Sequence, residues 1–143
     1  MKHTVIEIWL RRAIDSFAGA VFGGLVYAAW ATFANWDAGP RLALGIGLTH
    51  WLTSTFITYS GTGVMRQFFG AATTRRDGAL LSFVAGLAYT YIVLLAVHYA
   101  IGTPHIPLTL AAGVIPNVLF CSSYALLLAR TRNAIPLEAY RHE

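Results

Sequence analysis

Charged residues are scarce in this chain. Lysine, arginine, aspartate and glutamate make up 11% of its 143 residues, against about 25% in an average soluble domain. Hydrophobic residues make up 57%. This composition excludes a soluble enzyme, and the high apolar content also excludes a disordered or fibrous chain. We therefore expect a single membrane-embedded domain.

Acidic residues and cysteine are especially rare. The six acids are Glu7, Asp15, Asp37, Asp77, Glu138 and Glu143. None falls in the middle of a long apolar stretch, so the chain lacks the embedded carboxylate that a small proton-coupled multidrug exporter needs. The single Cys121 can form no intramolecular disulfide, and the cysteine pairs of metal sites are missing. No serine stands in a G-x-S-x-G motif. We expect no catalytic residue, no metal and no cofactor.

Long apolar stretches are what the chain has instead. Four of them lack lysine and arginine and lie near residues 13–34, 42–64, 78–101 and 107–129. A helix needs about 20 apolar residues to cross a hydrocarbon core about 30 Å thick. The sequence therefore predicts an all-α, polytopic membrane protein. Its single domain, residues 1–143, would hold four transmembrane helices arranged as two hairpins. Residues 1–12 would form an amphipathic cytoplasmic lead-in and residues 130–143 a cytoplasmic tail.

The basic residues predict the orientation. Nine of the ten fall on one side of these four helices, and only Arg41 falls on the other. The positive-inside rule then places both termini and the central loop in the cytoplasm, and we expect the inner membrane of a bacterium. The arginines at the inner helix ends lie where they would meet anionic lipid headgroups, an interpretation that we prefer to a nucleic-acid surface. They are Arg11, Arg12, Arg66, Arg75, Arg76 and Arg130.

The two hairpins share a pattern. A shift of 64 residues superposes Arg11 on Arg75, Pro40 on Pro104 and Arg66 on Arg130. The pattern fits a parallel internal repeat about an axis along the membrane normal. Alternatively, any two antiparallel hairpins of spanning length would have basic residues at their ends and prolines at their turns at similar positions, without a repeat.

Small residues predict where helices pack. Lipid tails are as apolar as leucine, so membrane helices associate through close packing at small side chains. Gly19 and Gly23 form such a pair in the first helix, and Ser82 and Gly86 form one in the third. The packing could lie within the chain or between subunits. We expect a homo-oligomer or a partner membrane subunit.

Polar side chains predict a substrate path. At 100° per residue, His50, Ser54 and Thr58 share one face of the second helix. Asn117 and Tyr124 share a face of the fourth helix, where Pro116 should free a backbone carbonyl. If these two faces oppose each other, they form an uncharged, hydroxyl-rich seam between the second and fourth helices.

Three functions are compatible with this pattern. The first is a small transporter or flippase-like protein that moves a neutral or lipid-linked substrate along the seam. The second is a non-catalytic accessory or assembly subunit of a larger membrane complex. The third is a haem- or quinone-binding redox subunit that uses His50 and His98. The rise per residue of a helix places these two histidines at membrane depths that differ by about 7 Å, which argues against a haem held between them.

The outline resembles one known family. A chain of about 140 residues with four helices and both ends in the cytoplasm resembles the GtrA-type proteins. Those proteins are thought to move polyprenyl-phosphate sugars. The chain departs from that family's signature asparagine and Asn-Arg-aromatic helix endings. Its second helix ends Gly-Val-Met-Arg-Gln-Phe-Phe at 63–69, and its fourth ends Leu-Leu-Ala-Arg at 127–130. The resemblance covers architecture, so it carries no residue roles across.

Overall fold

The protein is a bundle of helices. The computed structural model describes the backbone of residues 17–131 and the side chains of 21–131, and its regular structure there is entirely helical. The expected all-α class is thus confirmed for the described part of the chain. The predicted lead-in 1–12, with Arg11 and Arg12, and residues 132–143 of the predicted tail lie outside the described residues. The elements are α2 (Phe17–Ala34), the 3₁₀ helix η1 (Trp36–Ala38), α3 (Pro40–Ala71), α4 (Arg75–Ala100), α5 (Ile106–Ala111) and α6 (Val114–Thr131).

Capping residues explain where the long helices begin. Gly39, with φ +103°, turns the chain after η1, and Pro40 then occupies the first turn of α3, where a missing N–H costs nothing. Thr74 caps α4, because its side-chain oxygen accepts a hydrogen bond from the backbone N–H of Asp77 at 3.1 Å. These helices are long: α3 runs 32 residues, on through Arg66, and α4 runs 26.

The last apolar stretch forms two helices instead of the one expected over residues 107–129. Helix α5 ends at Ala111, and α6 begins at Val114. Pro116 explains the break, because it has no N–H for the carbonyl of Ala112 and its ring crowds that carbonyl. Helical bonding resumes where Asn117 donates from its backbone N–H to the carbonyl of Gly113 at 2.9 Å.

The two hairpins meet at their tips. Asn35, which follows α2, is completely buried and donates from Nδ2 to the carbonyl of Ala31 at 2.9 Å and to Oγ1 of Thr109 at 2.8 Å. Its Oδ1 accepts from the backbone N–H of His105 at 3.2 Å. On the surface, Nε2 of His105 lies 3.0 Å from Oδ2 of Asp37, and this hydrogen bond lowers the pKa of the Asp37 carboxyl. The tips of the two hairpins therefore lie at the same end of the bundle.

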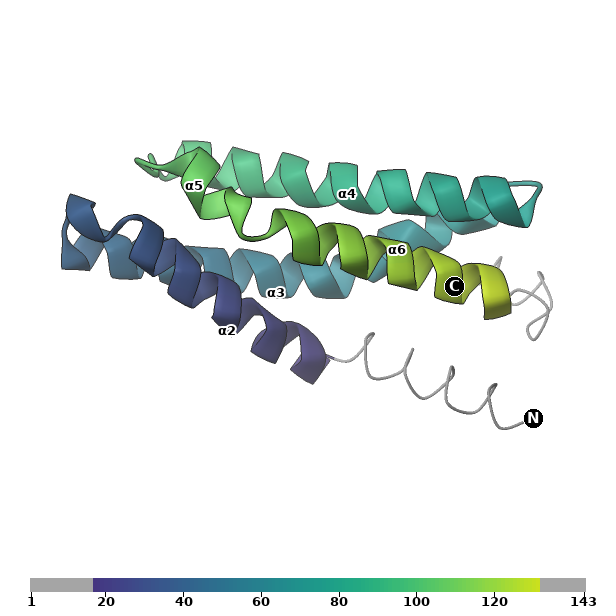
Figure 1. Cartoon of the computed structure of the whole chain (residues 1–143), viewed down its shortest axis with the longest axis horizontal. Helices are drawn as coiled ribbons and strands as arrows, with labels where there is room; N and C mark the ends of the chain where they lie inside the picture. Colours follow the sequence, from purple (N-terminus) through teal and green to yellow (C-terminus); the bar gives the residue numbers. More distant parts are fainter. Residues whose placement is uncertain (1–16, 132–143) are drawn as a thin grey trace.

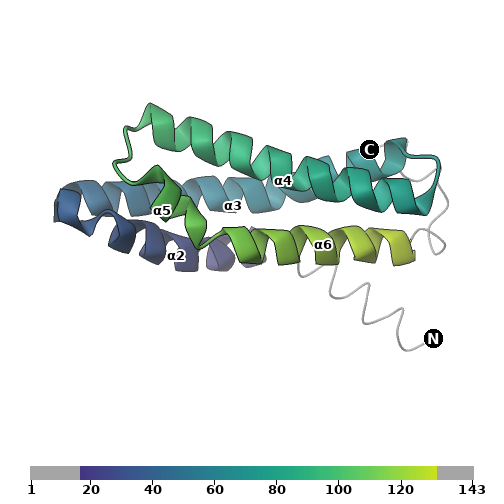
Figure 2. The same cartoon turned by 45° about the horizontal axis from the view of Figure 1, so that its top comes forward.

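These tips are not level with each other. Figures 1 and 2 both show the turn between α2 and α3 extending farther along the long axis than the end of α4. One consequence is that residues at different distances from their own helix ends can lie side by side.

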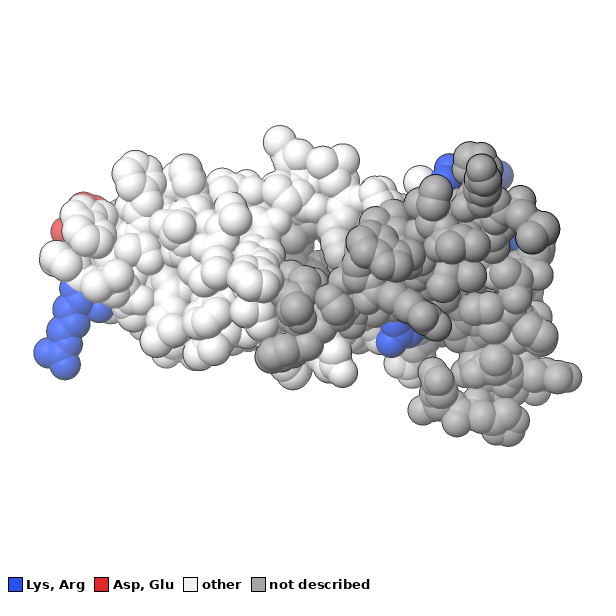
Figure 3. All heavy atoms as spheres, turned by 90° about the horizontal axis from the view of Figure 1, so that it is seen from below, with Lys and Arg blue, Asp and Glu red and all other residues white. Residues whose placement is uncertain are grey.

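Two helical segments are long and apolar enough to cross a membrane. They are Arg75–Ala100 and Ile106–Thr131, and the second includes the break between α5 and α6. Only 22% and 28% of their most apolar windows are buried inside the molecule. In Figure 3, the described surface between the charged residues at the left end and the grey residues shows no basic or acidic atoms.

Candidate functional site: a two-part pocket inside the bundle

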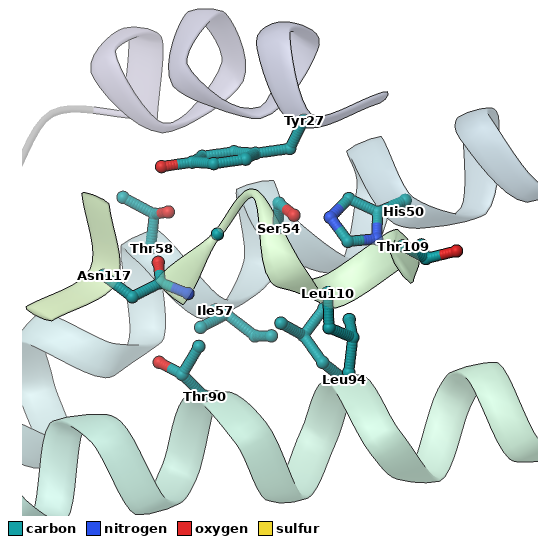
Figure 4. Close-up of a pocket in the computed structure, with 11 residues that line it drawn as sticks. Tyr27, His50, Ser54, Ile57, Thr58, Thr90, Leu94, Thr109, Leu110 and Asn117 are labelled. Atoms are coloured by element: carbon teal, nitrogen blue, oxygen red, sulfur yellow. The ribbon is translucent and has the colours of Figure 1, made fainter. Parts of the chain in front are cut away.

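A small polar pocket lies in the half of the bundle nearer the hairpin tips. Its volume is about 30 Å³, enough for one or two water molecules. Helices α2, α3, α4 and α5 and the start of α6 all contribute to it, as Figure 4 shows. The lining residues are Tyr27, His50, Ser54, Ile57, Thr58, Thr90, Leu94, Thr109, Leu110, Gly113 and Asn117. We call this space the polar pocket.

A larger and more apolar pocket continues from it. The volume of this apolar pocket is about 350 Å³, within the range of small-molecule sites. It shares Tyr27, Ile57, Thr58, Thr90 and Asn117 with the polar pocket. The residues that it adds are Gly23, Gly61, Met65, Gly86, Phe120 and Cys121. The two pockets together have a polar end and an apolar end.

Four of the five residues predicted to form a substrate path line the polar pocket. They are His50, Ser54, Thr58 and Asn117. The predicted seam between the second and fourth helices is wider than expected, because α2 and α4 also line it. Tyr27 and Thr90 are residues that the sequence did not single out for the site. Both are polar residues within long apolar stretches, and that position is the signal that could have found them.

The fifth predicted residue, Tyr124, lies elsewhere. Its side chain is completely buried in a core cluster with Met65, Phe69 and Leu128. Its hydroxyl accepts a hydrogen bond from Nη1 of Arg66 at 3.1 Å. The structure therefore does not bring Tyr124 to either pocket, and it gives Arg66 a partner within the bundle.

The remaining arginines and the predicted packing residues are placed as follows. Arg75 and Arg76 begin α4, and Arg130 lies in the last turn of α6. Gly86 packs closely, since a Cβ built there would lie 2.8 Å from Sδ of Met65 and 3.1 Å from Sγ of Cys121. Ser82, one turn earlier, is fully buried.

The first helix uses a different glycine from the one predicted. Gly23 faces the apolar pocket, and a Cβ added to it would have no neighbouring atom within 4 Å. Gly24 makes the close contact, because a Cβ there would lie 2.9 Å from Cδ1 of Trp51 on α3. The surroundings of Gly19 lie outside the described side chains.

The chain matches no protein-family model, no curated protein and no solved structure. The site must therefore be interpreted from its own geometry.

The most specific polar contact at the site joins two histidines. Nδ1 of His50 and Nε2 of His98 lie 2.7 Å apart, and the two side chains are 4% and 0% exposed. The depth difference of about 7 Å expected from helix rise is therefore wrong. The error came from treating the helix ends as level, whereas the hairpin tips are staggered.

This contact bears on whether the pair could hold a metal. A metal–imidazole bond is about 2.0–2.1 Å long, so an iron held between two opposing histidines separates their nitrogens by about 4 Å. At 2.7 Å, the two nitrogens instead share a hydrogen bond. The histidines as placed do not fit a bis-histidine haem.

Proposed function

We propose that the chain is a small integral membrane transporter or flippase-like protein that holds a neutral or lipid-linked substrate in the two-part pocket. Four transmembrane segments, formed by α2, α3, α4 and the broken helix α5–α6, would surround that pocket. Both termini would be cytoplasmic, in the inner membrane of a bacterium. Membrane lipids would be the molecules in contact with the outside of the bundle.

Exposed apolar side chains support the membrane setting. Phe22, Val26, Phe33, Ile92 and Ile115 are each at least two-thirds exposed, and they come from several helices. So much apolar surface around a soluble protein would promote aggregation. The same surface in lipid costs nothing, and the polar groups of α3 that would be expensive there are turned inward.

Buried polar residues also explain the low hydropathy of α3. Among the described helices, α3 does not meet the length and hydropathy criteria for a membrane span. Its buried residues include His50, Ser54 and Thr62, and such residues lower the hydropathy of a helix without exposing it to lipid. A helix that lines a substrate path is expected to have this character.

The single observation that carries the proposal is the junction of the two pockets. Hydroxyl, amide and imidazole groups converge at one end, and none of the lining residues is Asp, Glu, Lys or Arg. The other end is walled by glycine, sulfur and aromatic side chains. This arrangement fits an amphipathic molecule with an uncharged polar group and an apolar chain.

Native mass spectrometry of the purified protein in mild detergent tests the proposal. The wild-type chain should retain a stoichiometric amphipathic lipid whose polar group is uncharged. Thr58→Val removes a hydroxyl shared by both pockets and should lower retention by about three- to tenfold, the effect of losing one hydrogen bond. Gly23→Leu should abolish retention, since its side chain would occupy the apolar pocket.

Matched control variants separate these effects from general damage. Thr62→Val removes a more deeply buried hydroxyl from α3 that lines neither pocket. Gly45→Leu places the same bulk on α3 where nothing lies within 4 Å. Both controls should retain the lipid. A lipid-free protein that elutes only with a foreign membrane protein would contradict the proposal in favour of an accessory subunit, and a Soret band would do so in favour of a haem subunit.

A further inference from the structure

A continuous row of hydrogen bonds leads from the polar pocket to the loop after α4. Nδ1 of His50 is bonded to Nε2 of His98 at 2.7 Å, and Nδ1 of His98 is bonded to Oγ1 of Thr103 at 2.8 Å. The ring of His50 lines the pocket, and Figure 4 shows its second nitrogen pointing into that space. Both nitrogens of His98 are therefore used, whereas His50 presents Nε2 to the pocket.

The end of α4 fixes this geometry through its backbone. Gly102, with φ +67°, follows the last turn and donates from its N–H to the carbonyl of Tyr99 at 3.2 Å. The N–H of Thr103 donates to the carbonyl of His98 at 3.0 Å. These two bonds form a Schellman motif, which places Thr103 directly beside His98. Thr103 is 6% exposed, and its neighbours Gly102 and Pro104 are exposed.

We propose that His50, His98 and Thr103 form a proton relay that connects the polar pocket with the solution at the hairpin tips. The inference rests on the proposed function in one respect: the relay would supply the coupling ion for the substrate held in that pocket. It offers a route for protons into pockets that no carboxylate of the described residues lines.

The relay works by exchanging two tautomeric arrangements. In the first, His50 and His98 both carry their proton on Nδ1, so Nε2 of His50 offers the pocket a lone pair. A proton taken up there releases the proton on Nδ1 of His50 to Nε2 of His98. The proton on Nδ1 of His98 passes to Oγ1 of Thr103, whose own hydroxyl proton leaves to water. One proton enters and one leaves, both rings end neutral, and Nε2 of His50 now offers the pocket an N–H donor.

The groups around the rings of His50 and His98 favour proton exchange between these two rings. Tyr27 on α2 is the titratable group facing His50, with 6.4 Å between ring centroids, and Thr109 lies beside the pocket on α5. At the tips, Asp37 is hydrogen-bonded to His105 at 3.0 Å, and Arg41 lies in the first turn of α3. None of the residues that line the polar pocket is Asp, Glu, Lys or Arg.

Magic-angle-spinning NMR of the full chain, labelled with nitrogen-15 histidine in phosphatidylethanolamine and phosphatidylglycerol vesicles, tests the relay. Assignment uses His50→Gln and His98→Gln. In the wild type, both rings should show both tautomers, and the two populations should change together as temperature is varied, because the two arrangements hold the same number of protons and pH does not shift their ratio. Thr103→Val should shift the tautomer population of His50, although the hydroxyl of Thr103 is bonded to the other histidine ring, while Thr62→Val should leave it unchanged.

The outcomes separate the relay from a purely structural contact. If each ring is fixed in one tautomer across the temperature range, or if Thr103→Val leaves His50 unchanged, the relay is wrong. Should Thr103→Val fail to fold, the linked or unlinked temperature dependence of the two tautomer populations in the wild type still decides. Lipid retention is read separately on the same samples, so a working relay without a bound lipid would contradict only the proposed function.

Discussion

Two glycines only two positions apart in α3 face different surroundings. Gly47 lies against α2, where an added Cβ would meet the side chain of Thr32 and would come within 2.9 Å of the carbonyl of Ala28. Gly45 has nothing within 4 Å. Close approach of two backbones is what a glycine allows at a helix–helix contact in lipid.

This difference gives a residue-scale prediction. Gly47→Ala should destabilise the protein by about 1–3 kcal/mol, because a backbone carbonyl cannot move aside as a flexible side chain can. Gly45→Ala should be neutral or stabilising by up to about 1 kcal/mol, since alanine favours the helix. Unfolding of both variants in mixed detergent micelles with rising dodecyl sulfate measures the difference. Equal stability of the two variants would mean that α2 and α3 are not packed at Gly47.

At the scale of the element, the break between α5 and α6 shapes the polar pocket. Thr109 and Leu110 precede the break and Asn117 follows it, and all three line the pocket. On a straight helix Leu110 and Asn117 would also share a face, about 10 Å apart along the axis, so the break changes the angle at which the two segments approach the pocket. Pro116 thus contributes to the site through the backbone alone.

Restoring the missing hydrogen bond should therefore damage the site. Pro116→Ala supplies an N–H for the carbonyl of Ala112 and should join α5 to α6, slowing amide hydrogen exchange at residues 112–116 and reducing lipid retention. Pro107→Ala is the matched control, because Pro107 occupies the first turn of α5, where its missing N–H has no helical partner. Hydrogen–deuterium exchange read by mass spectrometry compares the two. Unchanged exchange around Ala112 in Pro116→Ala would show that another feature causes the break.

The sequence predicted some of these elements better than others. Apolar periodicity indicates that helices form, and the residues His50, Ser54 and Thr58 at helical spacing were expected to share a face. The contact between His50 and His98 could not be predicted, because it depends on the stagger of two hairpins that are far apart in sequence. The glycine at 102 indicates a helix end, but the effect of that end on Thr103 required the position of His98. Asn35 was missed because a lone asparagine before a turn is ordinarily a local cap.

At the scale of the whole molecule, charged residues of the described part lie toward the two ends of the bundle. Among the described residues, Asp37 and Arg41 lie at the hairpin tips, whereas Arg75, Arg76 and Arg130 lie at the opposite ends of their helices. A continuous α3 connects the two ends, and at 1.5 Å per residue it is about 48 Å long. That length exceeds the roughly 30 Å of a hydrocarbon core.

Cysteine labelling of intact cells tests the proposed orientation. In a Cys121→Ser background, Ala38→Cys at the tip should react with a membrane-impermeant maleimide from outside. Ala71→Cys, at the other end of α3, should react only after the cells are opened, because the arginine-rich end is expected in the cytoplasm. Labelling of both positions from outside would show that α3 does not span. The reverse pattern would keep the span and invert the orientation.

If the bundle spans a membrane as proposed, the stagger of the hairpin tips has a consequence for the bilayer around it. A lipid layer of uniform thickness cannot match the projecting turn between α2 and α3 and the lower end of α4 at once. The bundle must tilt, or the lipids beside α4 must thin, at a cost of about a fraction of a kcal/mol for each ångström of mismatch. Any tilt of one hairpin against the other would change the spacing of the helices that enclose both pockets. The acyl-chain length of the surrounding lipids would then change the shape of both pockets without direct contact with them.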